Sequence, residues 1–140
     1  MLKVVFDTNV IVSAALQEQS LPGLLLSLGL EDKVKFFVSP ALINEYEKVL
    51  VRPRLKLGFQ ECKELMDKIK QKVVLVKPTK RLTILKTDDP DNRILICALK
   101  AKADFIITGN KKHFSFEEFR GIKIVTPREF LAHLGDTLNH

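Results

Sequence analysis

Short apolar runs alternate along this chain with longer segments of helical period, and this alternation restricts the fold more than any other feature of the sequence. Each run is too short for a helix and is rich in Val, Ile or Phe, which favour strands. The runs cover residues 3–6, 35–38, 73–76, 104–108 and 123–125. Strands that alternate with helical segments typically form a parallel sheet wrapped by helices. The pattern therefore predicts an α/β fold with a central, mostly parallel sheet.

A polar residue followed by proline marks the start of several helical segments. The pairs are Ser39-Pro40, Asp89-Pro90 and Thr126-Pro127. In each pair the polar side chain can accept hydrogen bonds from free N–H groups, and proline fits the first turn because it has no N–H to leave unpaired. These pairs predict where helices begin. Residues 17–23 and 52–58 are the most loop-like stretches.

The length and composition fit one domain with a substantial core, so we expect residues 1–140 to form a single domain. The chain has 140 residues, of which 46% are hydrophobic, and its formal net charge is +6. Acidic residues are still plentiful, so the charge favours an anionic partner without identifying it. Solubility alone could also account for the charge.

The N-terminus and the cysteines indicate an intracellular protein. Residues 1–3 lead directly into the first apolar run, without the features of a secretory signal. The longest apolar stretch, residues 24–30, is far shorter than the ~20 residues of a membrane span. Cys62 and Cys97 lack the spacing of a zinc or redox motif. We therefore expect reduced thiols, a cytoplasmic location and no membrane segment.

Asp7 directly follows an apolar run, residues 4–6, so it places a carboxylate at the end of the first predicted strand. A charge at this point is costly unless a cation or hydrogen bonds satisfy it. Thr8 and Asn9 could hydrogen-bond the carboxylate and hold it as a metal ligand. Asp7 could equally cap the helix that begins near Val10. Taken alone, the two interpretations are about equal.

Glu45 lies in the helical segment that begins at Pro40, at the border of its apolar stripe. Residues advance ~100° around a helix, which places Glu45 beside Val49, whereas Asn44 and Lys48 point away from the stripe. A border glutamate can face a cleft, or it can pair with Lys48 at the surface. In isolation, Glu45 favours the surface interpretation.

Aspartates crowd the start of the helical segment at Pro90. Asp89 is placed to cap this helix, and Asp91 lies inside its first turn, where the helix dipole tolerates a negative charge. With Asp88, these carboxylates repel one another and favour a divalent cation. We therefore assign Asp91 a functional role and Asp89 a structural one, and leave Asp88 open.

Asp104 begins the apolar run that ends at Thr108, and Gly109 and Asn110 follow. In a parallel sheet, ligands bind beyond the carboxyl ends of the strands. This rule favours the residues after the run as site residues and places Asp104 toward the opposite edge, in a structural role. Asn110 can contact a ligand water or a phosphate, but it lacks the charge of a strong metal ligand.

The candidate ligands are carboxylates, and no histidine has a metal-binding spacing. Hard oxygen ligands of this kind suit Mg²⁺ or Mn²⁺ better than zinc. Such ions polarise a phosphate, generate hydroxide from water and stabilise the leaving oxygen. A basic protein with this site would act on a nucleic-acid backbone.

The motifs, in this order, resemble PIN-domain proteins, specifically the VapC-like toxins of prokaryotic toxin–antitoxin systems. The matching segments are residues 5–10, 39–45, 88–95 and 103–110, with Lys112-His113-Phe114 after them. Each segment alone is weakly specific, but the ordered set spans nearly the whole chain. The resemblance implies a three-layer α/β/α fold and a Mg²⁺- or Mn²⁺-dependent endoribonuclease that leaves a 5′-phosphate and a 3′-hydroxyl.

The resemblance also implies roles for individual residues. Asp7, Glu45 and Asp91 match the catalytic metal ligands, and Asp104 is a weaker candidate. The family's acidic position after the Thr-Gly pair is Asn110 here, which should weaken a second metal position. The implied contacts to the ligands or to phosphate are Thr8, Asn9, Thr108 and Asn110. The implied contacts to the RNA backbone are Arg93, Lys111, Lys112, Arg52 and Arg54, the last two in a turn that could equally be a solvated loop.

The resemblance further implies protein partners. Toxins of this type usually form dimers and are held inactive by a small antitoxin. We therefore expect a homodimer and an antitoxin partner, in addition to an RNA substrate.

Other functions fit parts of the same pattern. With Asn110 in place of an acid, the chain could be a PIN-fold module that binds RNA or an antitoxin without cutting. An aspartate at the end of a first parallel strand also serves phosphoryl transfer through an aspartyl-phosphate. Phosphatases of the haloacid-dehalogenase type need an aspartate where this chain has Asn9, and receiver domains need an acidic pair where it has Val5 and Phe6. The sequence therefore disfavours phosphoryl transfer.

Overall fold

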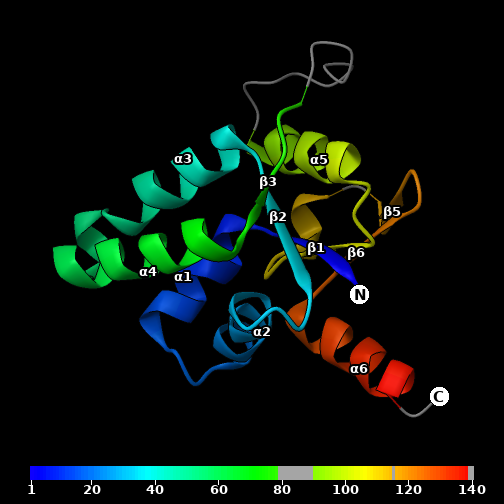
Figure 1. Ribbon diagram of the computed structural model, residues 1–140, viewed down its shortest axis with the longest axis horizontal. Helices are drawn as coiled ribbons and strands as arrows, with labels where there is room; N and C mark the ends of the chain where they lie inside the picture. The colour runs from blue at the N-terminus through cyan, green and yellow to red at the C-terminus, as the bar shows by residue number, and fades with distance from the viewer. Residues whose placement is uncertain (79–89, 115, 139–140) are drawn as a thin grey trace.

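Helices and short strands alternate along the chain (Figure 1). The computed structural model describes residues 1–78, 90–114 and 116–138. Short 3₁₀ turns cover Pro53–Leu55 and Lys111–His113. The remaining elements are β1 (Lys3–Phe6), α1 (Thr8–Leu16), α2 (Leu21–Leu30), β2 (Lys35–Val38), α3 (Pro40–Leu50), α4 (Phe59–Lys72), β3 (Val74–Leu75), α5 (Pro90–Ala101), β4 (Phe105–Ile107), β5 (Glu118–Phe119), β6 (Ile122–Val125) and α6 (Pro127–Leu138).

A six-stranded sheet with the order β3-β2-β1-β4-β6-β5 forms the centre of the fold. Its neighbouring strands run parallel, except that β5 is antiparallel to β6. Helix α5 packs on β1, β2 and β4 from one side, while α2 and α6 contact the sheet from the other (Figure 1). The prediction of a three-layer α/β/α fold with a mostly parallel sheet is confirmed.

The central strands β1 and β4 are apolar because both of their faces are covered. Val4, Val5 and Phe6 are completely buried, as are Ile106 and Ile107. Strands buried on both faces appear in the sequence as continuous apolar runs without alternation. Because both strands run in the same direction, their carboxyl ends lie side by side at one edge of the sheet.

The two ends of the sheet differ from the predicted pattern. Strand β3 is shorter than the predicted run, and Val74 and Leu75 are 41% and 50% exposed, as in an edge strand. The sequence pattern did not indicate β5. It forms a hairpin with β6 through Arg120 and Gly121, whose φ angles are 50° and 85°. Positive φ at both turn positions matches the twist of a tight hairpin.

The predicted helix starts agree with the structure where it describes them. The Ser39 hydroxyl accepts from the amide of Leu42 at 3.1 Å, and α3 begins at Pro40. Helices α5 and α6 begin at the prolines of the other two pairs. Asp88 and Asp89 lie outside the described residues.

Helix α2 begins inside a stretch that we expected to be a loop. Ser20 caps it, accepting from the amide of Gly23 at 3.3 Å. A Cβ atom at residue 23 would lie 2.0 Å from the carbonyl oxygen of Glu18, so only glycine fits at this first turn. The predicted loop is therefore limited to the few residues before Leu21.

The thiols of Cys62 and Cys97 are free and buried, as predicted. Burial raises the pKa of the Cys97 thiol to about 12, although hydrogen bonds with Ser39 act in the opposite direction. No helix in the part of the chain that the structure describes is long and apolar enough to cross a membrane.

Tyr46 joins helix α3 to the end of β1. Its side chain is completely buried, and its hydroxyl donates a hydrogen bond to the carbonyl oxygen of Phe6, the residue before Asp7. Burial raises the pKa of the Tyr46 phenol well above its ordinary value, with smaller contributions from Cys97, Asp7 and Glu45. The phenol therefore stays protonated, and it fixes α3 against the edge of the sheet that carries Asp7.

Replacing Tyr46 with phenylalanine should lower the free energy of unfolding by about 1 kcal/mol, because a buried carbonyl oxygen loses a hydrogen-bond donor while the ring still packs. Urea unfolding followed by circular dichroism measures this change. An unchanged unfolding midpoint would show that the phenol does not hold α3 to β1.

Candidate active site

The carboxyl ends of β1 and β4 bring two polar segments together, residues 7–9 and residues 108–110. Phe6 is in register with Ile107, and the Asp7 amide donates to the carbonyl oxygen of Ile107 at 2.8 Å. The polar segments therefore begin side by side, directly beyond the last buried residue of each strand. This is the edge at which ligands bind in parallel sheets.

The Asp7 carboxylate is held from both segments. One oxygen, Oδ1, accepts from the amide of Thr8 at 2.7 Å at the start of α1. The other, Oδ2, accepts from the Thr108 hydroxyl at 2.8 Å and lies 3.4 Å from the Asn9 side-chain nitrogen. Asp7 thus caps α1 and also lies in a polar cluster, so the two interpretations of this residue are not exclusive.

Thr8 connects Asp7 to Glu45. Its hydroxyl donates to Oε2 of Glu45, on α3, while its amide donates to Asp7. Thr8 is 8% exposed, so this bridge is shielded from water. The sequence alone favoured a surface position for Glu45, whereas its side chain is 12% exposed and faces the end of β1. Thr8 therefore hydrogen-bonds two carboxylates that are far apart in the sequence.

Arg93 supplies a positive charge on the outer side of this pair. Its Nη1 atom lies 3.5 Å from Oε1 of Glu45, and its side chain is 35% exposed. Arg93 comes from the first turns of α5, so the start of that helix lies beside the carboxylates. Asp91 is the second residue of the same helix, but its side chain is not among those that the structure describes.

Asn9 and Gly109 link the two polar segments through a hydrogen bond. The Gly109 amide donates to Oδ1 of Asn9 at 2.8 Å, and the Asn110 amide donates to the Thr108 hydroxyl at 3.1 Å. A Cβ atom at residue 109 would lie 3.2 Å from Oδ1 of Asn9, so glycine permits the close approach. The structure places Thr8, Asn9, Thr108 and Asn110 around the carboxylates, through direct hydrogen bonds or through Thr108, and their role toward a ligand or a phosphate stays a prediction.

Asp104 lies at the opposite edge of the sheet. Its Oδ2 atom accepts from the amide of Lys3 at 2.9 Å, at the start of β1. The length of β4, ~10 Å for three residues, separates it from the polar cluster. The strand-polarity argument predicted this position, and the structure does not bring Asp104 together with Asp7 and Glu45.

The family resemblance implies RNA cleavage, and replacing Asp104 with asparagine should leave that cleavage within about twofold of the wild type, because the amide oxygen can still accept from Lys3 and surface changes of this kind are small. A cleavage time course measures the effect. A loss as large as that of a site carboxylate would return Asp104 to the list of metal ligands.

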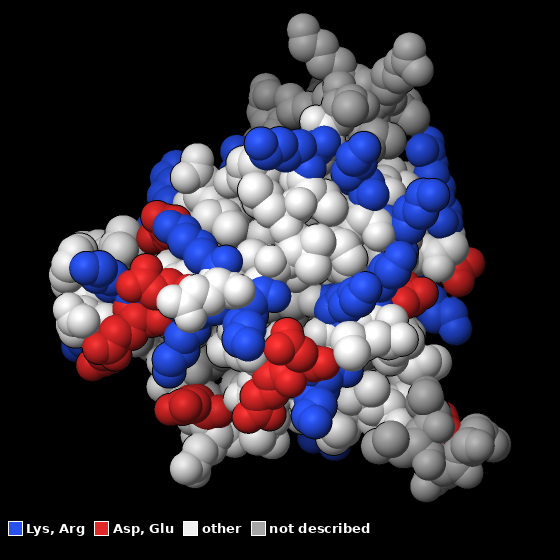
Figure 2. Space-filling model, in the orientation of Figure 1, with Lys and Arg blue, Asp and Glu red and all other residues white. Residues whose placement is uncertain are grey.

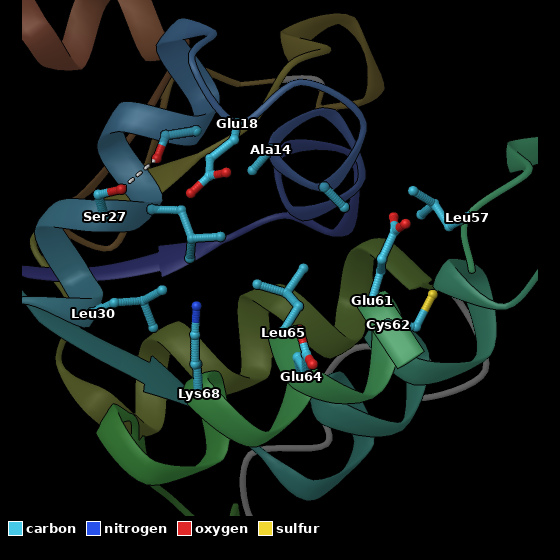
Figure 3. A pocket seen from close by; sticks show the side chains of 13 residues that line it. Ala14, Glu18, Ser27, Leu30, Leu57, Glu61, Cys62, Glu64, Leu65 and Lys68 are labelled. Carbon is cyan, nitrogen blue, oxygen red and sulfur yellow. Dashed lines mark hydrogen bonds between the residues drawn. The ribbon is translucent and has the colours of Figure 1, made fainter. Parts of the chain in front are cut away.

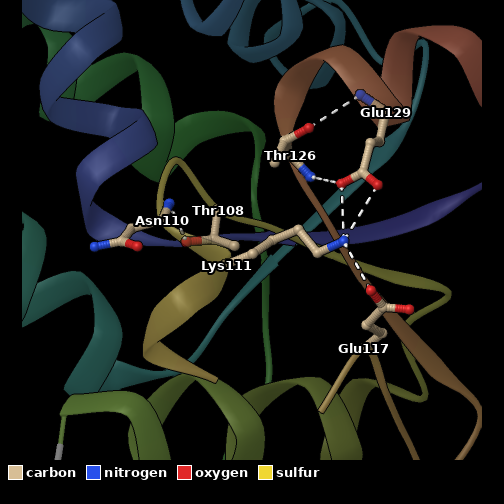
Figure 4. A network of polar contacts seen from close by, with 6 residues as sticks. All are labelled: Thr108, Asn110, Lys111, Glu117, Thr126 and Glu129. Atoms are coloured by element: carbon tan, nitrogen blue, oxygen red, sulfur yellow. Dashed lines mark hydrogen bonds and ion pairs between the residues drawn. The ribbon is translucent and has the colours of Figure 1, made fainter. Parts of the chain in front are cut away.

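Lys111 extends away from Asn110 toward helix α6 (Figure 4). Its ammonium group lies 3.2 Å from Glu129 and 3.7 Å from Glu117. Glu129 also accepts from the Thr126 amide at 2.9 Å, and its own amide donates to the Thr126 hydroxyl at 3.2 Å. The hydrogen bond from Thr126 lowers the pKa of the Glu129 carboxyl, and Lys111 acts in the same direction. This reciprocal capping of α6 was not predicted, although the Thr126-x-x-Glu129 spacing signals it.

The other predicted RNA contacts lie at the surface. Lys112 is exposed next to Lys111, and Arg52 and Arg54 are exposed in the turn after α3. On the face that Figure 2 shows, Lys and Arg line the upper edge of the described surface, and acidic side chains gather toward the lower left, over α4 and α2. Their role as RNA contacts stays a prediction.

The donors at this edge fit a hard divalent cation. Asp7 and Glu45 offer carboxylate oxygens that accept hydrogen bonds from Thr8, and oxygen ligands of this kind suit Mg²⁺ or Mn²⁺. In the described part of the chain, no group of three His, Cys, Asp or Glu side chains is arranged to hold a metal ion. The structure therefore brings together two carboxylates whose chemistry suits such an ion, and Asp91 is the predicted third ligand.

A separate hollow lies between α1, α2 and α4 (Figure 3). Its volume is about 310 Å³, and leucines line it together with Glu18, Glu61 and Lys68. None of the described residues around the carboxylate pair lines it. The hollow therefore contributes no group to the candidate active site.

The chain resembles known proteins in sequence and in fold. A family model described as PIN domain matches residues 3–112. The chain is 29% identical to the uncharacterized protein MJ1680 of Methanocaldococcus jannaschii over 141 residues, covering 93% of this chain and 90% of that protein. Its fold is similar to a chain in the crystal structure of VapBC2 from Rickettsia felis bound to a DNA fragment from their promoter. That similarity has a TM-score of 0.61 at 15% identity, and it covers 88% of this chain and 97% of the other.

Proposed function

This chain belongs to the PIN domain family, and from this premise we propose that it is a Mg²⁺- or Mn²⁺-dependent endoribonuclease that hydrolyses RNA phosphodiester bonds in the cytoplasm. The observation that carries the proposal is that Thr8 hydrogen-bonds both Asp7 and Glu45 at the carboxyl edge of the sheet. Asp7 and Glu45 are both partly buried, and neighbouring carboxylates repel each other unless a cation lies nearby. Arg93 offsets part of this charge from the outside.

Asp7 and Glu45, with Asp91, would hold the ion. When bound, it would polarise the scissile phosphate and lower the pKa of the attacking water. Thr8 fixes the spacing of the two carboxylates, and Thr108 holds Asp7 from the second strand. Arg93 is placed to contact a substrate phosphate, since its side chain reaches Glu45 and is still partly exposed.

We further propose that the protein is the toxin of a toxin–antitoxin pair and that it forms a homodimer. The similarity of its fold to a chain of VapBC2 from Rickettsia felis supports this biological setting. A small adjoining gene for a DNA-binding antitoxin would support the assignment, and its absence would favour a nuclease with another role.

Incubating the purified protein with a structured RNA and Mn²⁺ tests the activity directly. We expect slow endonucleolytic cleavage, with 5′-phosphate ends, that EDTA stops and added Mn²⁺ restores. Binding of the RNA without cleavage at any metal concentration would favour the alternative, a module of the same fold that binds RNA or an antitoxin without cutting.

Replacing Asn110 with aspartate should tighten Mn²⁺ binding by roughly tenfold, because a negative charge is added beside Thr108, which contacts Asp7. Isothermal titration calorimetry measures this affinity, and Asn110→Ala is the control without the charge. If the aspartate and alanine variants bind Mn²⁺ equally well, residue 110 does not face the ion.

A further inference from the structure

A groove on α3 continues from the candidate active site. Glu45 and Arg93 line one end of it, and Asn44, Lys48 and Val51 line it along the helix. Its volume is about 670 Å³, within the ~300–1,000 Å³ of typical ligand sites. The groove therefore connects the carboxylate pair with the surface of α3.

The groove follows one face of the helix. Ala41, Asn44, Lys48 and Val51 are exposed and are spaced three or four residues apart, the spacing of neighbours on a helix surface. From Glu45 to Leu50, the last residue of α3, the helix rises ~7.5 Å, and Val51 follows directly. Arg52 follows Val51 directly, so the groove runs from the carboxylates toward the basic turn after α3.

Lys48 is available to bind an anion, because the two glutamates that line the groove are paired with other residues. Glu45 is bound by Thr8 and Arg93, and Glu47 pairs with Lys70 at 2.7 Å. Among the residues that the structure describes, Lys48 has no ion pair or hydrogen bond. An anion in the groove would therefore meet an uncompensated ammonium group.

The remaining lining favours a nucleic-acid strand over a protein segment. Asn44 exposes an amide that can both donate and accept hydrogen bonds, as base edges and ribose hydroxyls require. Among the described residues that line the groove, Val51 is the one large apolar side chain, and it is 58% exposed. A protein partner would find little apolar surface to bury there.

We propose that this groove binds the RNA strand on one side of the scissile phosphate. Lys48 contacts a backbone phosphate, and Asn44 contacts a base edge or a ribose hydroxyl. The strand continues past Val51 toward Arg52. This inference rests on the proposed function, because it takes RNA as the substrate.

Salt-dependent binding of a short fluorescent single-stranded RNA, measured by fluorescence anisotropy in EDTA, tests the role of Lys48. Each phosphate contact on a single strand contributes ~0.7 to the slope of log affinity against log salt concentration. We expect Lys48→Ala to reduce this slope by about 0.7. The matched control is Lys35→Ala, which removes the same charge from an exposed position at the start of β2, and it should keep the wild-type slope.

Asn44 should behave differently, since it is uncharged. Asn44→Ala should weaken binding about equally at every salt concentration and leave the slope unchanged. Lysine acetylation read by mass spectrometry adds a direct measurement on the unaltered protein: bound RNA should protect Lys48 and leave Lys35 reactive.

Equal slopes for Lys48→Ala and Lys35→Ala, with no protection of Lys48, would overturn the groove assignment. The Lys48→Ala variant could instead form an assembly of different mass in solution while its RNA binding stays unchanged. That result would also overturn the assignment and would identify the groove as a protein interface. A wild-type protein that binds no RNA would instead refute the proposed function itself, so the two failures are distinguishable.

Discussion

Replacing Asp7 with asparagine is expected to reduce the rate of RNA cleavage on the order of 10³-fold or more. Asparagine keeps the shape of the side chain and can still accept from the amide of Thr8, but it removes the negative charge from the centre of the cluster. The cation would then lose a principal ligand. Single-turnover cleavage at saturating RNA, followed over a range of Mn²⁺ concentrations, measures the loss.

The fold of this variant should be intact. Asparagine caps helices as well as aspartate does, so α1 keeps its start. Removing one of two neighbouring carboxylates also relieves their repulsion, and the melting temperature without metal should not fall. Asp104→Asn makes the same chemical change at the opposite edge of the sheet and serves as the matched control. Cleavage of equal rate in the Asp7 variant would point to a contaminating nuclease and defeat the assignment.

Replacing Thr8 with valine should have the second largest effect, a reduction of roughly 10–100-fold in cleavage. Valine has nearly the same volume, but Oε2 of Glu45 loses its hydrogen-bond donor. Among the residues that the structure describes, Arg93 alone then holds Glu45, at 3.5 Å, and the distance of Glu45 from Asp7 is no longer fixed. We expect higher Mn²⁺ concentrations to be needed for half-maximal cleavage, which a metal titration of the cleavage rate measures.

Thr8→Ser is the conservative control, because it keeps the hydroxyl and loses only a methyl group. It should retain most of the activity. If the serine and valine variants cleave RNA equally well, the hydroxyl of Thr8 does not position Glu45, and the bridge between the two carboxylates has no catalytic consequence.

The central part of the fold was predictable because burial on both faces leaves a clear pattern. Strands β1 and β4 are continuous apolar runs, and the polar residue and proline before α3 mark its start. Strand β5 left no such signal, since it is short and its place is set by pairing with β6. The start of α2 was missed because the capping residue, Ser20, lies within a stretch of polar residues typical of a loop.

The candidate site was predictable where strand direction decides the position. The shared direction of β1 and β4 brings Asp7 and Thr108 together and moves Asp104 to the other edge. Glu45 was ambiguous from the sequence because its partner, Thr8, is far away along the chain. The orientation of Lys111 was unpredictable for the same reason: it depends on Glu129, which the packing of α6 supplies.

The pairing of Lys111 with Glu129 has a consequence for how the protein can be divided. The family match ends at residue 112, before β6 and α6. Yet β6 lies between β4 and β5, and Phe130 of α6 is completely buried. A protein shortened to the matched region would lose a sheet neighbour of β4 and the carboxylate that binds Lys111. The sheet and its packed core therefore extend past the residue at which the family match ends.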